Sequence, residues 1–110
     1  MTDTLKVLGQ AFPTSGNLVA LYTVPAATQT TVSSFAACNH DSSVGASFRM
    51  SIAINGAVDT PSQYVYYDLP LDINDTFICT VGFSLGAGDV VRVQSSSNNV
   101  SFSLYGVEVT

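Results

Sequence analysis

The chain has 110 residues, which is enough to bury one hydrophobic core and too few for two, so we expect a single domain over residues 1–110. Only 10% of the residues are charged, and 3 Lys and Arg stand against 8 Asp and Glu, which gives a formal net charge of −5. Affinity for nucleic acid comes largely from Lys and Arg, so we expect no direct nucleic-acid binding from this composition. The chain shows neither a signal peptide nor an apolar run long enough to cross a membrane, so we expect synthesis in a cytoplasm and no membrane partner.

Turn signals recur about every ten residues, a spacing typical of β-sandwiches and barrels. No stretch between them has sustained helical periodicity. The expected strands are, in chain order, 4–8, 18–24, 30–38, 47–54, 63–69, 76–85, 90–95 and 100–109. Residues 1–10 are either an N-terminal arm or the first strand. These segments predict an all-β fold, a two-sheet antiparallel β-sandwich of about eight strands that is jelly-roll-like.

Alternation of apolar and polar residues predicts which side chains face the core. In the third strand it places Val32 on one face with Ser34, and Phe35 on the other face. The strongest apolar faces belong to the fourth, sixth and last strands, and the core that they predict is Phe48, Met50, Ile52, Ile54, Phe77, Val81, Phe83, Phe102 and Leu104.

Two turns have specific chemistry. Asn55 and Gly56 favour positive φ, in a tight turn or at the start of a longer loop that reaches Pro61. Gly86, Gly88 and Asp89 predict a hairpin turn in which the Asp89 carboxylate accepts hydrogen bonds from turn amides. The same glycines superficially resemble a phosphate-binding loop, but no Walker lysine accompanies them and no helix follows.

No catalytic constellation is expected. His40, Asp41, Ser42 and Ser43 include the residue types of a Ser–His–Asp triad, yet triad members must converge from separate elements, so we interpret the segment as a loop. His40 is the only histidine, which leaves no other general base of near-neutral pKa. We therefore expect a protein that is not an enzyme and that needs no cofactor.

Two sets of residues have the chemistry of a metal site or a disulfide. Asp68, Asp72 and Asp75 are close in sequence and offer oxygen ligands for a cation, but a structural loop is the preferred interpretation because calcium needs six or more oxygens. Cys38 and Cys79 are expected to be reduced, buried thiols, with a disulfide between neighbouring strands as the alternative. No metal site is predicted.

Contact residues are expected in two places. Tyr64, Tyr66 and Tyr67 form an aromatic run in which strict alternation places Tyr64 and Tyr66 on one face and Tyr67 on the other. Tyrosines pack in cores but are also enriched at interfaces and sugar sites, so both interpretations stay open. Leu5 and Val7 are the predicted contact residues of the N-terminal segment.

Several short motifs, in order and spacing over nearly the whole chain, resemble small β-sandwich virion proteins of tailed bacteriophages. The matching stretches are the opening 4–10, Tyr22-x-Val24-Pro25, the Thr/Val-rich segment that closes on Cys38-Asn39, Leu85-x-x-Gly88-Asp89-x-Val91, and Gly106-Val107-Glu108-Val109. None of these motifs carries a catalytic residue.

The resemblance implies a structural protein of the virion, made in the host cytoplasm. The first hypothesis is a capsid decoration or cement protein that bridges and stabilises major capsid subunits. Its expected partners are the major capsid protein and other copies of itself, with which it would form a trimer. The alternative is a tail, baseplate or fibre component that binds another virion protein or a host surface glycan, with exposed tyrosines lining a sugar site.

Overall fold

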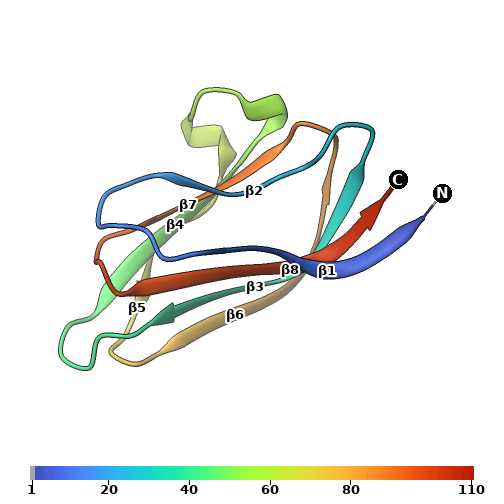
Figure 1. The fold of residues 1–110 in the computed structure, drawn as a ribbon. Coiled ribbons are helices and arrows are strands. Elements are labelled where there is room, and N and C mark those ends of the chain that lie inside the picture. The colour runs from blue at the N-terminus through green and yellow to red at the C-terminus, as the bar shows by residue number, and fades with distance from the viewer. Residues whose placement is uncertain (1) are drawn as a thin grey trace.

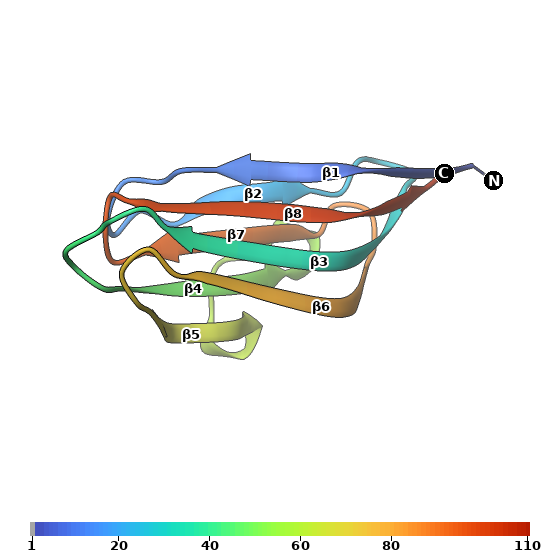
Figure 2. The same cartoon turned by 90° about the horizontal axis from the view of Figure 1, so that it is seen from below.

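The computed structural model describes residues 2–110, apart from the side chain of Val81. Eight strands account for most of the chain and pack in two layers (Figures 1 and 2). Their bounds are β1 Asp3–Ala11, β2 Val19–Thr23, β3 Gln29–Asn39, β4 Ala46–Ala53, β5 Tyr64–Leu71, β6 Thr76–Leu85, β7 Val90–Ser95 and β8 Val100–Val109. Two single 3₁₀ turns, Ile54–Gly56 and Pro61–Gln63, lie between β4 and β5. No helix among residues 2–110 is long and apolar enough to cross a membrane.

The strand order confirms the predicted jelly-roll sandwich. One sheet has the order β1-β8-β3-β6 and the other β2-β7-β4-β5, and all pairs are antiparallel. The pairs β1·β8, β2·β7, β3·β6 and β4·β5 are nested, as in one long hairpin rolled up on itself. Such a double-sheet arrangement of eight strands is the jelly roll.

Residues 3–11 lie in the sheet and do not form a free arm. β1 pairs with β8 from Asp3 to Ala11. Backbone hydrogen bonds between Thr2 and Thr110, of 2.8 and 3.0 Å, continue the ladder to the C-terminus. The two termini therefore lie side by side at one end of the molecule (Figure 1).

The core lies between the two sheets and is centred on aromatic rings. Phe35 stacks on Phe102 at a centroid distance of 6.1 Å and tilts against Phe48 at 5.9 Å. Of the predicted core, Phe48, Met50, Phe102 and Leu104 are buried. Three more residues are partly buried and pack against this core, namely Ile52, Phe77 and Phe83.

Ile54 lies outside the core. Ile54 is 74% exposed, so its assignment to the core was wrong. The physical reason is that β4 ends at Ala53, and Ile54 opens the 3₁₀ turn that leads the chain away from the sheet. The side chain of Val81 lies outside the described part of the structure.

A bulge in β3 overturns the predicted faces of that strand. Its register with both neighbours, β6 and β8, shifts between Val32 and Ser34. The extra residue lets Val32 face the core together with Phe35 and Ala37, and all three are fully buried. Strict alternation had separated Val32 from Phe35, because alternation assumes that no residue is inserted.

The turn residues behave as their chemistry predicts. Asn55 and Gly56 have φ values of 54° and 70° and open the longer loop toward Pro61. The Asp89 carboxylate accepts hydrogen bonds from the Gly86 amide and from the Asn55 amide, both at 2.9 Å. Asp89 therefore closes its own hairpin and also ties it to the loop that follows β4.

We predict that Asp89→Ala lowers the free energy of unfolding by about 1–3 kcal/mol, because the two amides lose their common acceptor. Urea denaturation followed by far-UV circular dichroism measures this loss. Asp72→Ala is the matched control, since Asp72 is an exposed aspartate in a loop at another turn. Equal stability of the two variants would contradict the role assigned to Asp89.

A polar network closes one end of the sandwich. The Tyr22 hydroxyl donates to Glu108 at 2.6 Å and lies 2.8 Å from the Thr30 hydroxyl, while Lys6 donates to Glu108 at 3.3 Å. The hydrogen bond from Tyr22, with help from Lys6, holds the pKa of Glu108 below its ordinary value. Burial, followed by the bond to Glu108, raises the pKa of Tyr22 to about 12.

This network predicts a stability loss in acid. The pKa of Glu108 is lower in the native state than in the unfolded chain, so the unfolded chain binds a proton there at a higher pH. The free energy of unfolding therefore rises with pH between the native and the unfolded pKa of Glu108. The contribution of Glu108 is complete above an ordinary glutamate pKa of about 4.3 and is lost as the pH falls through the native pKa. Urea denaturation between pH 6 and about pH 3 should therefore show a shallower decline for Glu108→Gln than for the unmodified protein. An equally steep decline in both would refute this assignment.

Candidate functional site

The outer face of the β1-β8-β3-β6 sheet carries no charge over three successive rows of side chains. The rows, read across the four strands, are Leu5–Val107–Thr31–Ser84, Val7–Tyr105–Ser34–Thr80 and Gln10–Ser103–Ala36–Ile78. We call these twelve residues the uncharged face. Leu5 is 80% exposed, Ile78 68% and Val7 49%, so large apolar side chains stand in solvent on this sheet. The two contact residues predicted in the N-terminal segment, Leu5 and Val7, both lie on it.

The three tyrosines of β5 divide in a way that alternation does not predict. In the β4·β5 register, Tyr64 is the partner of Ser51 and Tyr66 is the partner of Met50. Met50 and Ser51 are consecutive on β4, whereas one residue separates the two tyrosines on β5. Tyr64 therefore points outward and Tyr66 inward, and the prediction that they share a face was wrong. Irregular register along β4 and β5 is the physical reason.

Tyr66, the third tyrosine of the predicted contact set, is partly buried and packs against the core. Its ring stacks on Phe35 at 6.1 Å and meets Phe77 edge-on at 5.1 Å. Its hydroxyl donates to the Cys79 sulfur at 2.9 Å. Burial, followed by this bond, raises the pKa of Tyr66 to about 12.

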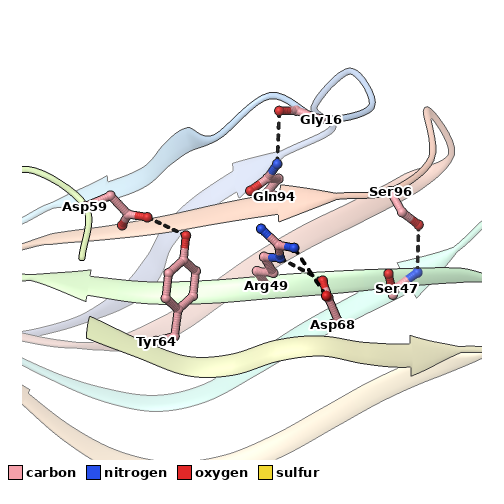
Figure 3. A network of polar contacts seen from close by, with 8 residues as sticks. All are labelled: Gly16, Ser47, Arg49, Asp59, Tyr64, Asp68, Gln94 and Ser96. Atoms are coloured by element: carbon pink, nitrogen blue, oxygen red, sulfur yellow. Dashed lines mark hydrogen bonds and ion pairs between the residues drawn. The ribbon is translucent and has the colours of Figure 1, made fainter. Parts of the chain in front are cut away.

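Tyr64 and Tyr67 form an outward-facing pair. Their rings lie 5.0 Å apart at an interplanar angle of 86°. The Tyr64 hydroxyl donates to the Asp59 carboxylate (Figure 3), and this hydrogen bond raises the pKa of Tyr64 above its ordinary value. Tyr67 is 59% exposed. The two rings, with Asp59, Thr60 and Pro61, line an open pocket of about 430 Å³, which we call the tyrosine pocket.

Arg49 fixes the position of Tyr67. Its guanidinium carbon lies 4.1 Å from the centre of the Tyr67 ring. The same guanidinium donates from Nε and Nη2 to the two carboxylate oxygens of Asp68, at 2.7 and 3.2 Å (Figure 3). This two-bond pairing raises the pKa of Arg49 and lowers the pKa of Asp68.

A smaller pocket of about 130 Å³ lies at the Arg49–Asp68 pair. Arg49 and Asp68 both line it, together with serines and Gln94 from the neighbouring strands. Gln94 donates to the Gly16 carbonyl at 3.0 Å, and the Ser96 hydroxyl accepts from the Ser47 amide at 2.9 Å (Figure 3). The outer face of the β2-β7-β4-β5 sheet thus holds two pockets, and the Arg49 guanidinium lines the smaller one and contacts Tyr67 of the tyrosine pocket.

The loop between β4 and β5 forms the wall of the tyrosine pocket. Arg92 of β7 donates to the carbonyls of Ala57 and Gly56 at 2.8 and 3.2 Å, which holds the start of the loop against the sheet. Thr60 and Gln63 form a capping box around the Pro61–Gln63 turn. Asp59 is therefore held next to Tyr64 by a loop that is tied to the sheet at both ends.

The structure separates the residues that resemble a catalytic triad. The His40 ring nitrogen Nε2 lies 2.8 Å from the Ser101 hydroxyl, on β8. The Asp41 carboxylate instead accepts from the amides of Ser43 and Val44 and from the Asn99 side chain. His40 and Ser101, with Phe12 packed edge-on against the imidazole at 5.6 Å, line a shallow open pocket.

The structure does not cluster the three carboxylates of Asp68, Asp72 and Asp75. Asp68 pairs with Arg49 on the sheet face, whereas the Asp75 carboxylate accepts from the Thr76 amide at 2.9 Å. Within residues 2–110, no group of three or more His, Cys, Asp or Glu side chains is placed to hold a metal ion.

The two cysteines are unpaired and lie on opposite faces of the same sheet. Cys79 is the register partner of the buried Phe35 and points inward, whereas Cys38 pairs with Ser101 and Thr76 and points outward. A disulfide between them is therefore ruled out by geometry. Both thiols are only partly buried, which corrects the expectation of full burial.

Comparison with known proteins identifies no family. No protein-family model matches the chain, and no curated protein matches it. Among solved structures, a pentameric capsid protein isolated from metagenomic phage sequences is similar over 93% of this chain, with 15% sequence identity and a TM-score of 0.33. The match spans only 59% of that protein's chain.

Proposed function

We propose that this protein is a bacteriophage virion structural protein that acts as a capsid decoration or cement protein and bridges major capsid subunits. The observation that carries the proposal is the uncharged face. A jelly-roll sandwich already has its core between the sheets, so Leu5, Val7 and Ile78 on the outer surface contribute nothing to that core. Their burial against another subunit contributes about 25 cal/mol for each Å² of apolar surface removed from water.

The lack of charge on this face suits a close protein contact. A charged side chain buried at an interface must be paired or it loses its hydration at high cost, and none of the twelve positions poses this problem. The fold agrees with the proposal because jelly rolls serve in viral capsids, although they also serve in lectins and enzymes. No catalytic role is proposed.

Particles that lack the protein test the proposal directly. We expect them to lose their DNA at a lower temperature and under milder osmotic shock than complete particles, and to recover when purified protein is added back. Equal resistance of the two kinds of particle would refute the cement role. A copy number of only a few per particle would instead place the protein in the tail, baseplate or fibre.

Surface variants locate the contact. The double variant Leu5→Asp with Ile78→Asp should fold normally, since both side chains are largely exposed, and should fail to restore particles that lack the protein. Val58→Asp is the matched control, because Val58 is 84% exposed but lies in the loop between β4 and β5, away from the uncharged face. Restoration by the double variant would exclude the uncharged face as the contact.

A further inference from the structure

The tyrosine pocket on the other sheet is a second surface feature, separate from the uncharged face. We propose that it binds a neutral saccharide, with Tyr64 and Tyr67 as the stacking walls and Asp59 and Thr60 as hydrogen-bonding groups. The proposal concerns the isolated protein and does not depend on where the protein sits in a particle.

The walls of the pocket are held in position before any ligand arrives. Tyr67 lies against the Arg49 guanidinium, and this guanidinium donates hydrogen bonds to both carboxylate oxygens of Asp68. Tyr64 is held by its hydrogen bond to Asp59 (Figure 3). Side chains that are already ordered lose little conformational entropy on binding, which favours affinity for a small ligand.

The charges around the pocket select the class of ligand. Arg49 already occupies the Tyr67 ring as its cation partner, so a cationic ligand meets a like charge there. An anionic ligand meets the carboxylate of Asp59, which lines the pocket. A neutral ligand avoids both penalties, and hydroxyl groups on it can donate to Asp59 or exchange hydrogen bonds with Thr60.

The shape and surroundings of the pocket agree with a sugar. Two perpendicular aromatic walls and a proline offer apolar surface to the C–H faces of a pyranose ring, while the polar groups meet its hydroxyls. The smaller pocket on the same sheet is lined by the Arg49–Asp68 pair, Phe48, Gln94 and several serines. A second sugar unit that extends over this ion pair would therefore reach Gln94 and the serines of β4 and β7.

Amide NMR spectra of ¹⁵N-labelled protein test the proposal with a panel of neutral sugars, namely methyl β-galactoside, methyl α-mannoside, methyl β-glucoside and N-acetylglucosamine. We expect at least one sugar to shift the amides of Arg49 and residues 59–68. Tyr67→Ala should weaken that binding about tenfold or more. Tyr105→Ala, which removes a partly exposed tyrosine from the opposite sheet, should leave it unchanged.

Choline and N-acetylneuraminic acid serve as the cationic and anionic probes. The proposal is overturned if no neutral sugar shifts these amides, if choline or the anionic sugar binds there in preference, or if Tyr67→Ala binds as well as the unmodified protein. Tyr67 is largely exposed, so its loss is not expected to unfold the protein. The spectrum of Tyr67→Ala reports its fold in the same experiment.

Discussion

Replacement of Gly106 by alanine is expected to lower the free energy of unfolding by about 3 kcal/mol, the upper end of the usual cost of overpacking. A Cβ atom at this position would lie 2.2 Å from the Thr31 carbonyl oxygen and 3.0 Å from the Leu8 side chain. The nearest atom is backbone of β3, a strand hydrogen-bonded on both sides, so it cannot move without disturbing its sheet. The sheet must therefore distort around β3 and β8.

Gly82→Ala is the control for this prediction. Gly82 lies in a strand of the same sheet, and a Cβ atom there meets nothing within 4 Å. Its stability should stay within about 0.5 kcal/mol of the unmodified protein. Urea denaturation of both variants at neutral pH measures the difference, and similar midpoints for the two would show that the close approach at Gly106 relaxes freely.

Phe35→Ala is expected to destabilise the protein by about 3–5 kcal/mol, because it removes a buried ring from the centre of the core and leaves a cavity. Phe35 is fully buried and contacts three other rings, Phe48, Tyr66 and Phe102. The total stability of a domain is about 5–15 kcal/mol, so this loss is a large share of it. Thermal or urea denaturation gives the value.

Ile78→Ala is the control for Phe35→Ala, because it shortens a large apolar side chain that is not buried. Ile78 is also a large apolar residue of the β1-β8-β3-β6 sheet, but it is 68% exposed on the outer side. We expect its truncation to change stability by less than about 0.5 kcal/mol. A cost near that of Phe35→Ala would mean that the outer face is already packed against something in solution, such as another copy of the chain.

The sequence alone determined the strands, most of their ends and the turn chemistry. These features depend on residues close together in the chain: alternation with period two, an Asn-Gly pair with positive φ, and an aspartate that accepts from its own turn. Asn55, Gly56 and Asp89 accordingly adopt the predicted roles. The number and spacing of the strands predicted a jelly-roll-like sandwich, and the tertiary structure supplied the strand order.

Only the tertiary structure decided which face several strands present. Alternation fails wherever a strand takes up an extra residue, and the register of each neighbouring strand determines where that happens. Val32 and Phe35 therefore share the core, and Tyr66 separates from Tyr64. No local pattern marks these positions.

The geometry of the candidate sites could not be predicted from the sequence, for a related reason. Arg49 meets Tyr67 and Asp68 across two strands, and His40 meets Ser101 across 61 positions of the chain. Such contacts arise from strand pairing, which the one-dimensional order does not encode locally. The sequence thus identified tyrosines and apolar residues as contact candidates. Only the folded sheets showed that Leu5 and Val7 stand on one outer face, that Tyr64 and Tyr67 line a pocket on the other, and that Tyr66 packs against the core.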